Sequence, residues 1–274
     1  MKTKYSSLFS LPYLIWSLIF IIVPMGLVVV FAFTTESGQF TLDYVSQVGE
    51  YTSVLVRSVW LAAIATVICL LIGYPLAFIM SRMPGFQQRT MLMLIMLPMW
   101  MNFLLRTYAW MTILEKNGLL NKLLGLVGLG PFDMINTQGA VVLGMVYNYL
   151  PFMILPLYSI MTKIDNRTIE AAQDLGANTK NVFTRIVIPM SMPGISTGIT
   201  MVFVPSVSTF IISRMLGGGG NLLIGDLIDL QFLGNAYNPH LGSAISLVLM
   251  VLILLCMSVL NQFNGDEDRE GMLL

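Results

Sequence analysis

Long runs of apolar residues dominate this chain and predict its secondary structure. Five of them contain no charged residue and approach the roughly 20 residues that a helix needs to cross a bilayer: 11–33, 58–80, 139–161, 195–213 and 241–260. A sixth run begins at Met91 and stays uncharged as far as Leu105, because Arg106 follows. We predict a helix over 91–113, with Arg106 near its outer end or facing protein. The pattern predicts an all-α polytopic membrane protein with six transmembrane helices in one domain over 1–274.

The composition is typical of a protein embedded in a lipid bilayer. Its residues are 56% hydrophobic and only 10% charged, with a mean hydropathy of +0.80, whereas a soluble domain carries about 25% charged residues. The net charge is +0 and no basic run occurs, so the bilayer, and not a nucleic acid, is the expected partner. Cys69 and Cys256 lie in apolar runs, and we expect neither a disulfide nor a metal site.

The first apolar run follows Lys2 and Lys4, as in a signal peptide. It is longer than the usual 7–15 residues of such a peptide, and no small-residue cleavage site follows, which favours a retained helix. With the N-terminus inside, nine Lys and Arg residues fall on the inner side and five on the outer side. The inner set is Lys2, Lys4, Arg82, Arg89, Lys163, Arg167, Lys180, Arg185 and Arg269, and the outer set is Arg57, Arg106, Lys116, Lys122 and Arg214. The positive-inside rule therefore predicts that both termini are cytoplasmic.

Prolines interrupt most of the predicted spans. They are Pro24, Pro75, Pro98, Pro151, Pro156 and Pro205. Each removes a backbone donor, which membrane helices tolerate where neighbouring groups satisfy the freed carbonyl. The pattern is typical of kinked helices around a path, although proline is also common in transmembrane helices in general.

One charged segment, residues 162–194, separates two apolar runs, and we call it the polar segment. Asp165 or Asn166 is suited to cap a short helix. Gly176 is suited to end that helix, because glycine adopts the left-handed conformation without penalty. Asn178 or Thr179 can then cap a second short helix that ends before Pro189. The segment is either a docking module for a partner protein or an amphipathic loop on the membrane surface.

A signature in the polar segment favours the first alternative. The stretch "EAAQDLGANTKNVFTRIVIP" resembles the EAA signature of permease subunits in binding-protein-dependent ABC importers: E-A-A, three residues, G, nine residues, then I-x-L-P. The positions that match in identity and spacing are Glu170, Ala171, Ala172, Gly176, Ile186 and Pro189, while Ile188 stands where leucine is usual. The resemblance implies the permease fold of a type I importer, with these residues coupling it to a cytoplasmic ATPase.

The same resemblance implies several partners. They are a second permease that forms a heterodimer with this chain, two cytoplasmic ATPase subunits and an extracellular binding protein. ATP would be bound by the ATPase subunits and no cofactor by this chain, which agrees with the absence of a G-x-x-x-x-G-K-[ST] loop; "LGGGGNLLIG" has glycines but no lysine. The chain would then be a non-catalytic subunit in a bacterial cytoplasmic membrane.

Several other stretches resemble the permeases of polyamine importers. They include "IGYPLAFIMSRMP", "MLPMWMNFLLRTYAW", "YNYLPFMILPLYSIM" and "LGGGGNLLIGDLIDLQFL". The resemblance implies spermidine or putrescine as cargo and an extracellular polyamine-binding protein. The alternatives are a permease for another small charged solute, a secondary transporter, and a membrane scaffold that moves no solute. A secondary transporter would need ionisable groups at mid-membrane, which five of the six predicted spans lack.

A cationic cargo requires carboxylates and aromatic faces along its path. The candidates are Asp226, Asp229, Trp100, Asn102, Tyr108, Trp110, Tyr147 and Asn148, with Tyr149 beside them. The aromatic residues also fit an interfacial belt, the carboxylates a solvated outer loop, and the asparagines hydrogen bonds between helices. Arg106 and Arg214 would repel an amine unless they are paired, and Asp226, Asp229 and Glu115 are the nearest candidate partners.

Overall fold

The computed structural model describes residues 12–234 and 236–262, and in this part of the chain the secondary structure is helical. A single antiparallel bridge joins Thr34 to Phe40, and no sheet forms among these residues. The prediction of an all-α protein is confirmed. Lys2, Lys4 and Arg269, which contributed to the predicted orientation, lie outside the described residues. The described chain falls into two compact units: residues 12–55 with 227–254, and 56–226 with 255–262.

The first unit contains the N-terminal helix and most of the C-terminal one. The N-terminal helix, Pro12–Ala32, contains a π-turn, Leu18–Ile22, and ends in α2, Val23–Ala32. Two short elements follow, α3 (Asp43–Gln47) and η2 (Val48–Tyr51), and α14 spans Pro239–Gln262. His240 Nδ1 lies 3.0 Å from the carbonyl oxygen of Phe31, and its ring stacks on that of Tyr44. The histidine thus joins the start of α14 to the end of α2.

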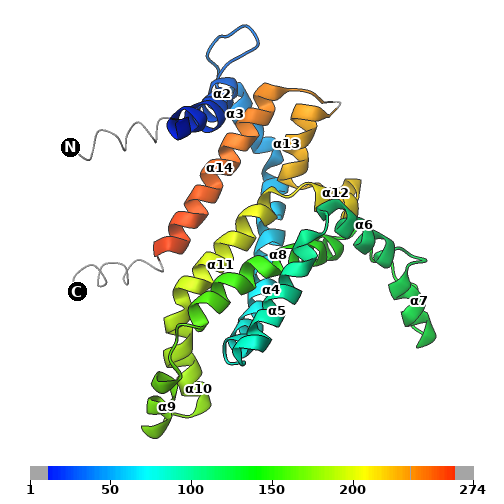
Figure 1. The fold of residues 1–274 in the computed structure, drawn as a ribbon. Helices are drawn as coiled ribbons and strands as arrows, with labels where there is room; N and C mark the ends of the chain where they lie inside the picture. Colours follow the sequence, from blue (N-terminus) through cyan, green and yellow to red (C-terminus); the bar gives the residue numbers. More distant parts are fainter. Residues whose placement is uncertain (1–11, 235, 263–274) are drawn as a thin grey trace, which may run out of the picture. The chain divides into compact units, whose positions relative to one another are not determined.

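The second unit carries most of the core. Its helices are α4 (Thr52–Ser81), α5 (Gly85–Trp100), α6 (Phe103–Leu114), α7 (Leu119–Leu126), α8 (Gln138–Met161), α9 (Asn166–Asp174), α10 (Thr179–Val182), α11 (Ile188–Ser208), α12 (Ile211–Leu216) and α13 (Ile224–Leu233), the last of which extends into the first unit. Figure 1 shows α8 and α11 side by side. Fully buried side chains of α8, among them Met145, Met153 and Leu157, pack with Cys69 and Met80 of α4. The predicted central helix 139–161 is therefore the middle of this unit.

Two glycines bring α11 close to α8. Gly194 and Gly198 are four residues apart, the spacing at which small residues let membrane helices approach. A Cβ at Gly198 would lie 2.7 Å from Met153 Sδ, and one at Gly194 would lie 3.1 Å from the carbonyl oxygen of Pro156. The backbones are close enough that α8 fills the space a larger side chain would need.

Two predicted spans are not single helices. The run predicted over 91–113 is interrupted between α5 and α6. The chain bends there by 89°, measured between Gly85–Trp100 and Phe103–Leu126. Pro98 lies two residues before the end of α5, and the Asn102 side chain accepts hydrogen bonds from the backbone of Leu104 and Leu105, so α6 starts anew. The run predicted over 195–213 ends early, because α11 stops at Ser208 and α12 begins at Ile211. Five helices, or six if the bent pair is one span, are long and apolar enough to cross a membrane among the described residues.

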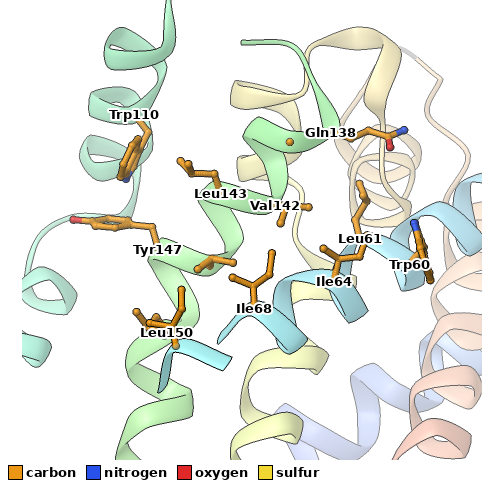
Figure 2. A pocket seen from close by; sticks show the side chains of 13 residues that line it. Trp60, Leu61, Ile64, Ile68, Trp110, Gln138, Val142, Leu143, Tyr147 and Leu150 are labelled. Carbon is orange, nitrogen blue, oxygen red and sulfur yellow. The ribbon is translucent and has the colours of Figure 1, made fainter. Parts of the chain in front are cut away.

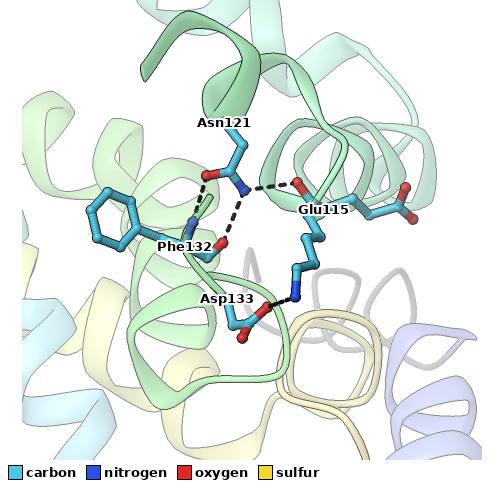
Figure 3. A network of polar contacts seen from close by, with 5 residues as sticks. Glu115, Asn121, Phe132 and Asp133 are labelled. Atoms are coloured by element: carbon cyan, nitrogen blue, oxygen red, sulfur yellow. Dashed lines mark hydrogen bonds and ion pairs between the residues drawn. The ribbon is translucent and has the colours of Figure 1, made fainter. Parts of the chain in front are cut away.

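The segment between α6 and α8 is held by the side chain of Asn121 (Figure 3). Its Nδ2 donates to the carbonyl oxygens of Glu115, at 3.2 Å, and Phe132, at 2.9 Å, while its Oδ1 accepts from Phe132 N at 2.9 Å. Lys116 and Asp133 form an ion pair of 3.6 Å nearby, but both side chains are exposed, and such pairs stabilise by about 0–1 kcal/mol. The hydrogen bonds of the buried Asn121 amide therefore hold this segment more strongly than the exposed ion pair does.

Candidate functional site

The polar segment folds as the sequence predicts up to Gly176. Asp165 caps α9 by accepting a hydrogen bond from Arg167 N at 3.0 Å. Gly176 has φ +84°, and two hydrogen bonds close the helix: Gly176 N to the Gln173 oxygen, at 2.9 Å, and Ala177 N to the Ala172 oxygen, at 3.0 Å. This pair of bonds is the Schellman motif, which needs a left-handed residue at the position of Gly176. The glycine thus sets the direction in which the chain leaves α9.

The second helix of the polar segment does not end before Pro189, so that prediction was wrong. Asn178 caps α10 through a 2.8 Å bond from Asn181 N, and the helix then runs without a break from Thr179 to Ser208. A π-turn over Phe183–Val187 precedes Pro189, which lies in the first turn of α11. A proline inside a helix leaves a carbonyl without its donor, and the wider hydrogen bonding of the π-turn occurs at that point.

A small core attaches the polar segment to α4. Ile164, Val182 and Val187 are buried together, with Ile169 and Ala172 packed against them. The ring of Phe183 lies edge-to-face with the rings of Tyr74 and Phe78 of α4, each at 5.6 Å between centroids. The Tyr74 hydroxyl also forms a 2.8 Å hydrogen bond with the Ser191 hydroxyl. A displacement of the polar segment is therefore transmitted to α4 as well as to α8 and α11, which continue it in sequence.

Arg82, just after α4, makes a further link to the start of α9. Its Nη1 donates to the carbonyl oxygen of Ile164 at 3.1 Å and to Oδ1 of Asn166. Its guanidinium also lies 5.4 Å from the ring centroid of Phe78. Burial lowers the pKa of Arg82 from its ordinary value. Sequence reasoning missed this role, because only the fold brings residues 82 and 166 together.

The resemblance to the EAA signature implies that this chain couples solute uptake to a partner ATPase, and replacing Arg82 with methionine is then expected to lower uptake several-fold while ATP hydrolysis continues. Methionine keeps an apolar stem over Phe78 but loses both hydrogen bonds to the polar segment, and bonds to a charged group contribute about 1.5–3 kcal/mol each. Solute uptake and ATPase activity of the same reconstituted complex give the measurement. Arg89→Met, at an exposed position of α5, is the control. Equal uptake in both variants would contradict a role for the Arg82 link.

Two residues of the signature, Glu170 and Ala171, lie on an exposed surface near the end of α9. Glu170 and Ala171 are exposed, and the Leu175 side chain is 90% exposed. Ala172 and Ile186 are half-buried, and Pro189 is exposed. Figure 1 shows α9 and α10 together at one end of α8 and α11. An apolar tip with a carboxylate at its edge has the form of a protein-docking surface, because an exposed leucine gains free energy when a partner covers it.

Two of the predicted path residues, Trp110 and Tyr147, lie together in a hollow of about 710 Å³. Their rings meet edge-to-face at 5.3 Å, and apolar side chains of α4 and α8 line the remainder (Figure 2). Gln138 is the one polar aliphatic side chain among the lining residues, which include no carboxylate. This hollow supplies aromatic faces to a cation but no counter-charge.

The other predicted path residues are dispersed. Trp100 and Tyr108 are exposed, and Asn102 caps α6. Asn148 is only 3% exposed and donates from Nδ2 to the Gly144 oxygen within its own helix, at 2.9 Å. The structure therefore does not gather the predicted aromatic and amide groups into one site.

The two predicted carboxylates differ in their surroundings. Asp226 is fully buried, accepts a hydrogen bond from Leu223 N at 2.9 Å, and has Oδ1 3.7 Å from Nε of Arg214. Because Asp226 balances the charge of Arg214, this arginine does not add an unpaired positive charge that would repel an amine. Asp229 is half-buried and lies three residues further along α13, in the first unit. In the described conformation Asp226 stabilises the turn between α12 and α13.

Comparison with known proteins gives the family. The model of the family described as "Binding-protein-dependent transport system inner membrane component" matches residues 73–264, which include the whole of the signature. The chain belongs to this family. The permease is thus a multi-pass inner-membrane subunit, not itself catalytic, of a transport system that depends on a binding protein.

Several curated relatives align with this permease over most of its length. It is 40% identical over 265 residues to the spermidine/putrescine transport system permease protein PotB of Haemophilus influenzae, covering 93% of this chain and 92% of the relative. It is 37% identical over 248 residues to PotB of Escherichia coli, covering 87% and 90%.

Solved structures share the fold of this permease at low sequence identity. A chain of a bacterial ABC transporter involved in alginate import superposes with a TM-score of 0.74 at 20% identity, covering 94% of this chain and 93% of that one. A second structure of an alginate ABC transporter, in complex with a pentasaccharide-bound periplasmic protein, gives 0.73 at 19% identity. The expected permease fold of an ABC importer is confirmed.

Proposed function

We propose that this permease imports spermidine and putrescine as one half of the path of an ATP-driven transporter. The observation that carries the proposal is the 40% identity to a spermidine/putrescine permease over 93% of the chain. The alignment covers 93% of the chain, so the proposal concerns nearly the whole chain and not a shared motif. No observation favours the other solute classes over polyamines.

The proposed complex contains a second permease, two cytoplasmic ATPase subunits and an extracellular polyamine-binding protein. ATP binds to the ATPase subunits, and this chain binds no cofactor. Both termini and the polar segment face the cytoplasm, as the excess of basic residues on that side favours. The heterodimer would enclose the path between its two permeases, which agrees with the absence of a gathered cation site in the described residues of this one.

The polar segment would couple the path to the ATPases. Leu175 and Ala171 seat in a groove of the ATPase subunit, and Glu170 fixes the register at its edge. When ATP binding closes the ATPases, α9 moves with them, and the links from the polar segment to α4 and α11 carry that movement into the core. The path then opens outward to the binding protein, and ATP hydrolysis returns it inward.

Uptake of labelled spermidine and putrescine in cells that lack this chain tests both parts. Wild-type protein is expected to restore uptake, and Glu170→Lys to leave it at least tenfold lower with the same amount of inserted protein, because the charge at the docking edge is reversed. Lys163→Glu, which reverses the charge of an exposed side chain that lies before α9, is the control and is expected to transport.

The outcomes separate cargo from coupling. Unchanged polyamine uptake after deletion, in cells with no second polyamine system, would exclude polyamines as the cargo. Normal uptake by Glu170→Lys would exclude α9 as the docking element and leave the cargo untouched.

A further inference from the structure

Arg106, in the first turns of α6, is a buried cation without a counter-charge in the described residues. Only 8% of the residue is exposed, and the buried Nε and Nη1 atoms have no hydrogen-bond partner there. Its guanidinium lies 5.8 Å from the centroid of the Phe103 ring. A guanidinium stays charged in proteins, and a buried charge is costly unless it is paired and hydrogen-bonded. The state of lowest free energy must therefore supply an anion.

The carboxylates of the same unit do not provide that anion. Residues 56–226 contain six. Glu115 is nine residues further along, about 13 Å up a helix axis at 1.5 Å per residue. Asp226 is engaged with Arg214 and Leu223 N, and Asp133 pairs with Lys116. The other three belong to the polar segment: Asp165, Glu170 and Asp174. With Arg214 balanced by Asp226, Arg106 leaves one net positive charge in this part of the unit.

A small hollow is lined by Phe103, the residue whose ring the Arg106 guanidinium faces. It measures about 230 Å³, and Phe103 and Tyr149 line it together with the hydroxyl-bearing Ser208 and Thr209 at the break between α11 and α12. The Arg106 guanidinium lies 5.8 Å from the centroid of the Phe103 ring, which forms part of the wall of this space. Organic ligands occupy pockets of about 300–1,000 Å³. The hollow is smaller and has room for one acidic side chain.

The surface around Arg106 indicates where that side chain comes from. Leu105 and Tyr108 on the same helix are 63% and 53% exposed. Lipid chains can cover such residues but offer no acceptor to a guanidinium. An apolar surface around a single cation is instead the arrangement of a subunit interface, in which charges are few and paired.

We infer that Arg106 forms an ion pair with an aspartate or glutamate of the second permease subunit, an inference that rests on the heterodimer of the proposed function. The pair orients α6 of this chain against the partner at the point where the helix restarts after Asn102. It also neutralises the cation that would otherwise repel a polyamine at this depth. Arg106 is a positioning residue and does not contact the cargo.

The inference predicts that replacing the arginine has opposite effects on the chain alone and on the complex. In the purified full-length chain, Arg106→Met removes an uncompensated charge and is expected to raise Tm by about 3 °C, since 1 kcal/mol corresponds to about 2–4 °C in a chain of this size. In the complex with the second permease, the same change leaves the partner's carboxylate buried and is expected to lower Tm and uptake. Arg106→Lys, which keeps the charge, is the control and falls between wild type and methionine in both preparations.

A suppressor selection identifies the source of the anion. Arg106→Glu is expected to reduce uptake at least tenfold, and uptake is expected to return when an acidic residue of the second permease becomes Lys or Arg. Suppressors confined to this chain would overturn the inference. Equal destabilisation of the chain and of the complex by Arg106→Met would also overturn it. A third contrary result would be a wild-type chain that melts at a higher temperature in chloride than in gluconate, when the Arg106→Met chain does not, because a free anion would then be the partner of Arg106. Wild-type complex that forms but takes up no polyamine refutes the proposed cargo and leaves the comparison of melting temperatures valid.

Discussion

Replacing Gly176 with valine is expected to lower polyamine uptake more than tenfold without changing the amount of protein in the membrane. Gly176 has φ +84°, where a side chain costs about 1–2 kcal/mol and a β-branched one more. A Cβ there meets nothing within 4 Å, so the effect is not a steric clash but a change in the backbone. To relieve the strain, the chain must give up the two hydrogen bonds that close α9, and the docking surface then points elsewhere. Uptake and ATPase activity of the reconstituted complex measure the loss of coupling.

Gly176→Asn is the matched control. Asparagine tolerates the left-handed conformation better than other residues with a Cβ, so this variant is expected to retain most of the uptake. If valine and asparagine reduced uptake equally, the side chain itself and not the backbone angle would be responsible. Normal uptake with valine would show that the direction of α9 does not matter.

Replacing Gly198 with leucine is expected to remove most folded protein from the membrane. The first carbon of the new side chain would already lie 2.7 Å from Met153 Sδ and 3.3 Å from the Met153 oxygen, in the centre of the packing between α8 and α11. Overpacking a core costs about 1–3 kcal/mol, and more where a backbone must move. The amount of inserted protein and the Tm of the purified complex give the measurement.

Gly26→Leu controls for the general effect of adding a leucine to an apolar helix. Gly26 lies inside α2, and a Cβ there meets nothing within 4 Å. Its variant is expected to accumulate normally. Wild-type levels of the Gly198 variant would contradict the close approach of α8 and α11.

Local patterns were sufficient to predict much of the architecture. The uninterrupted apolar runs at 58–80, 139–161 and 241–260 lie inside α4, α8 and α14, because length and hydrophobicity alone determine where such helices form. The caps at Asp165 and Asn178 and the left-handed glycine at 176 were also predictable, since each depends on neighbours within three or four residues.

The errors occurred where two local signals compete. Pro98 and Asn102 end one helix and start another, yet the same apolar run continues through both. Pro189 was expected to stop a helix, whereas its place in the first turn of α11 and the π-turn before it let the helix continue. The link from Arg82 to Asn166 and the pairing of Arg214 with Asp226 depend on tertiary packing, which no local pattern encodes.

The helix that runs unbroken from Thr179 to Ser208 has a mechanical consequence. Its 30 residues, at 1.5 Å each, make a rod of about 45 Å. A tilt of about 10° at one end of such a rod displaces the other by roughly 8 Å, so in the proposed coupling a small rotation of the polar segment becomes a large movement near Ser208. The π-turn at Phe183–Val187 is the place along this lever where the hydrogen-bond pattern changes, and bending concentrates there. In the proposed mechanism, the stiffness of this π-turn would set how much of a movement of the polar segment reaches Ser208.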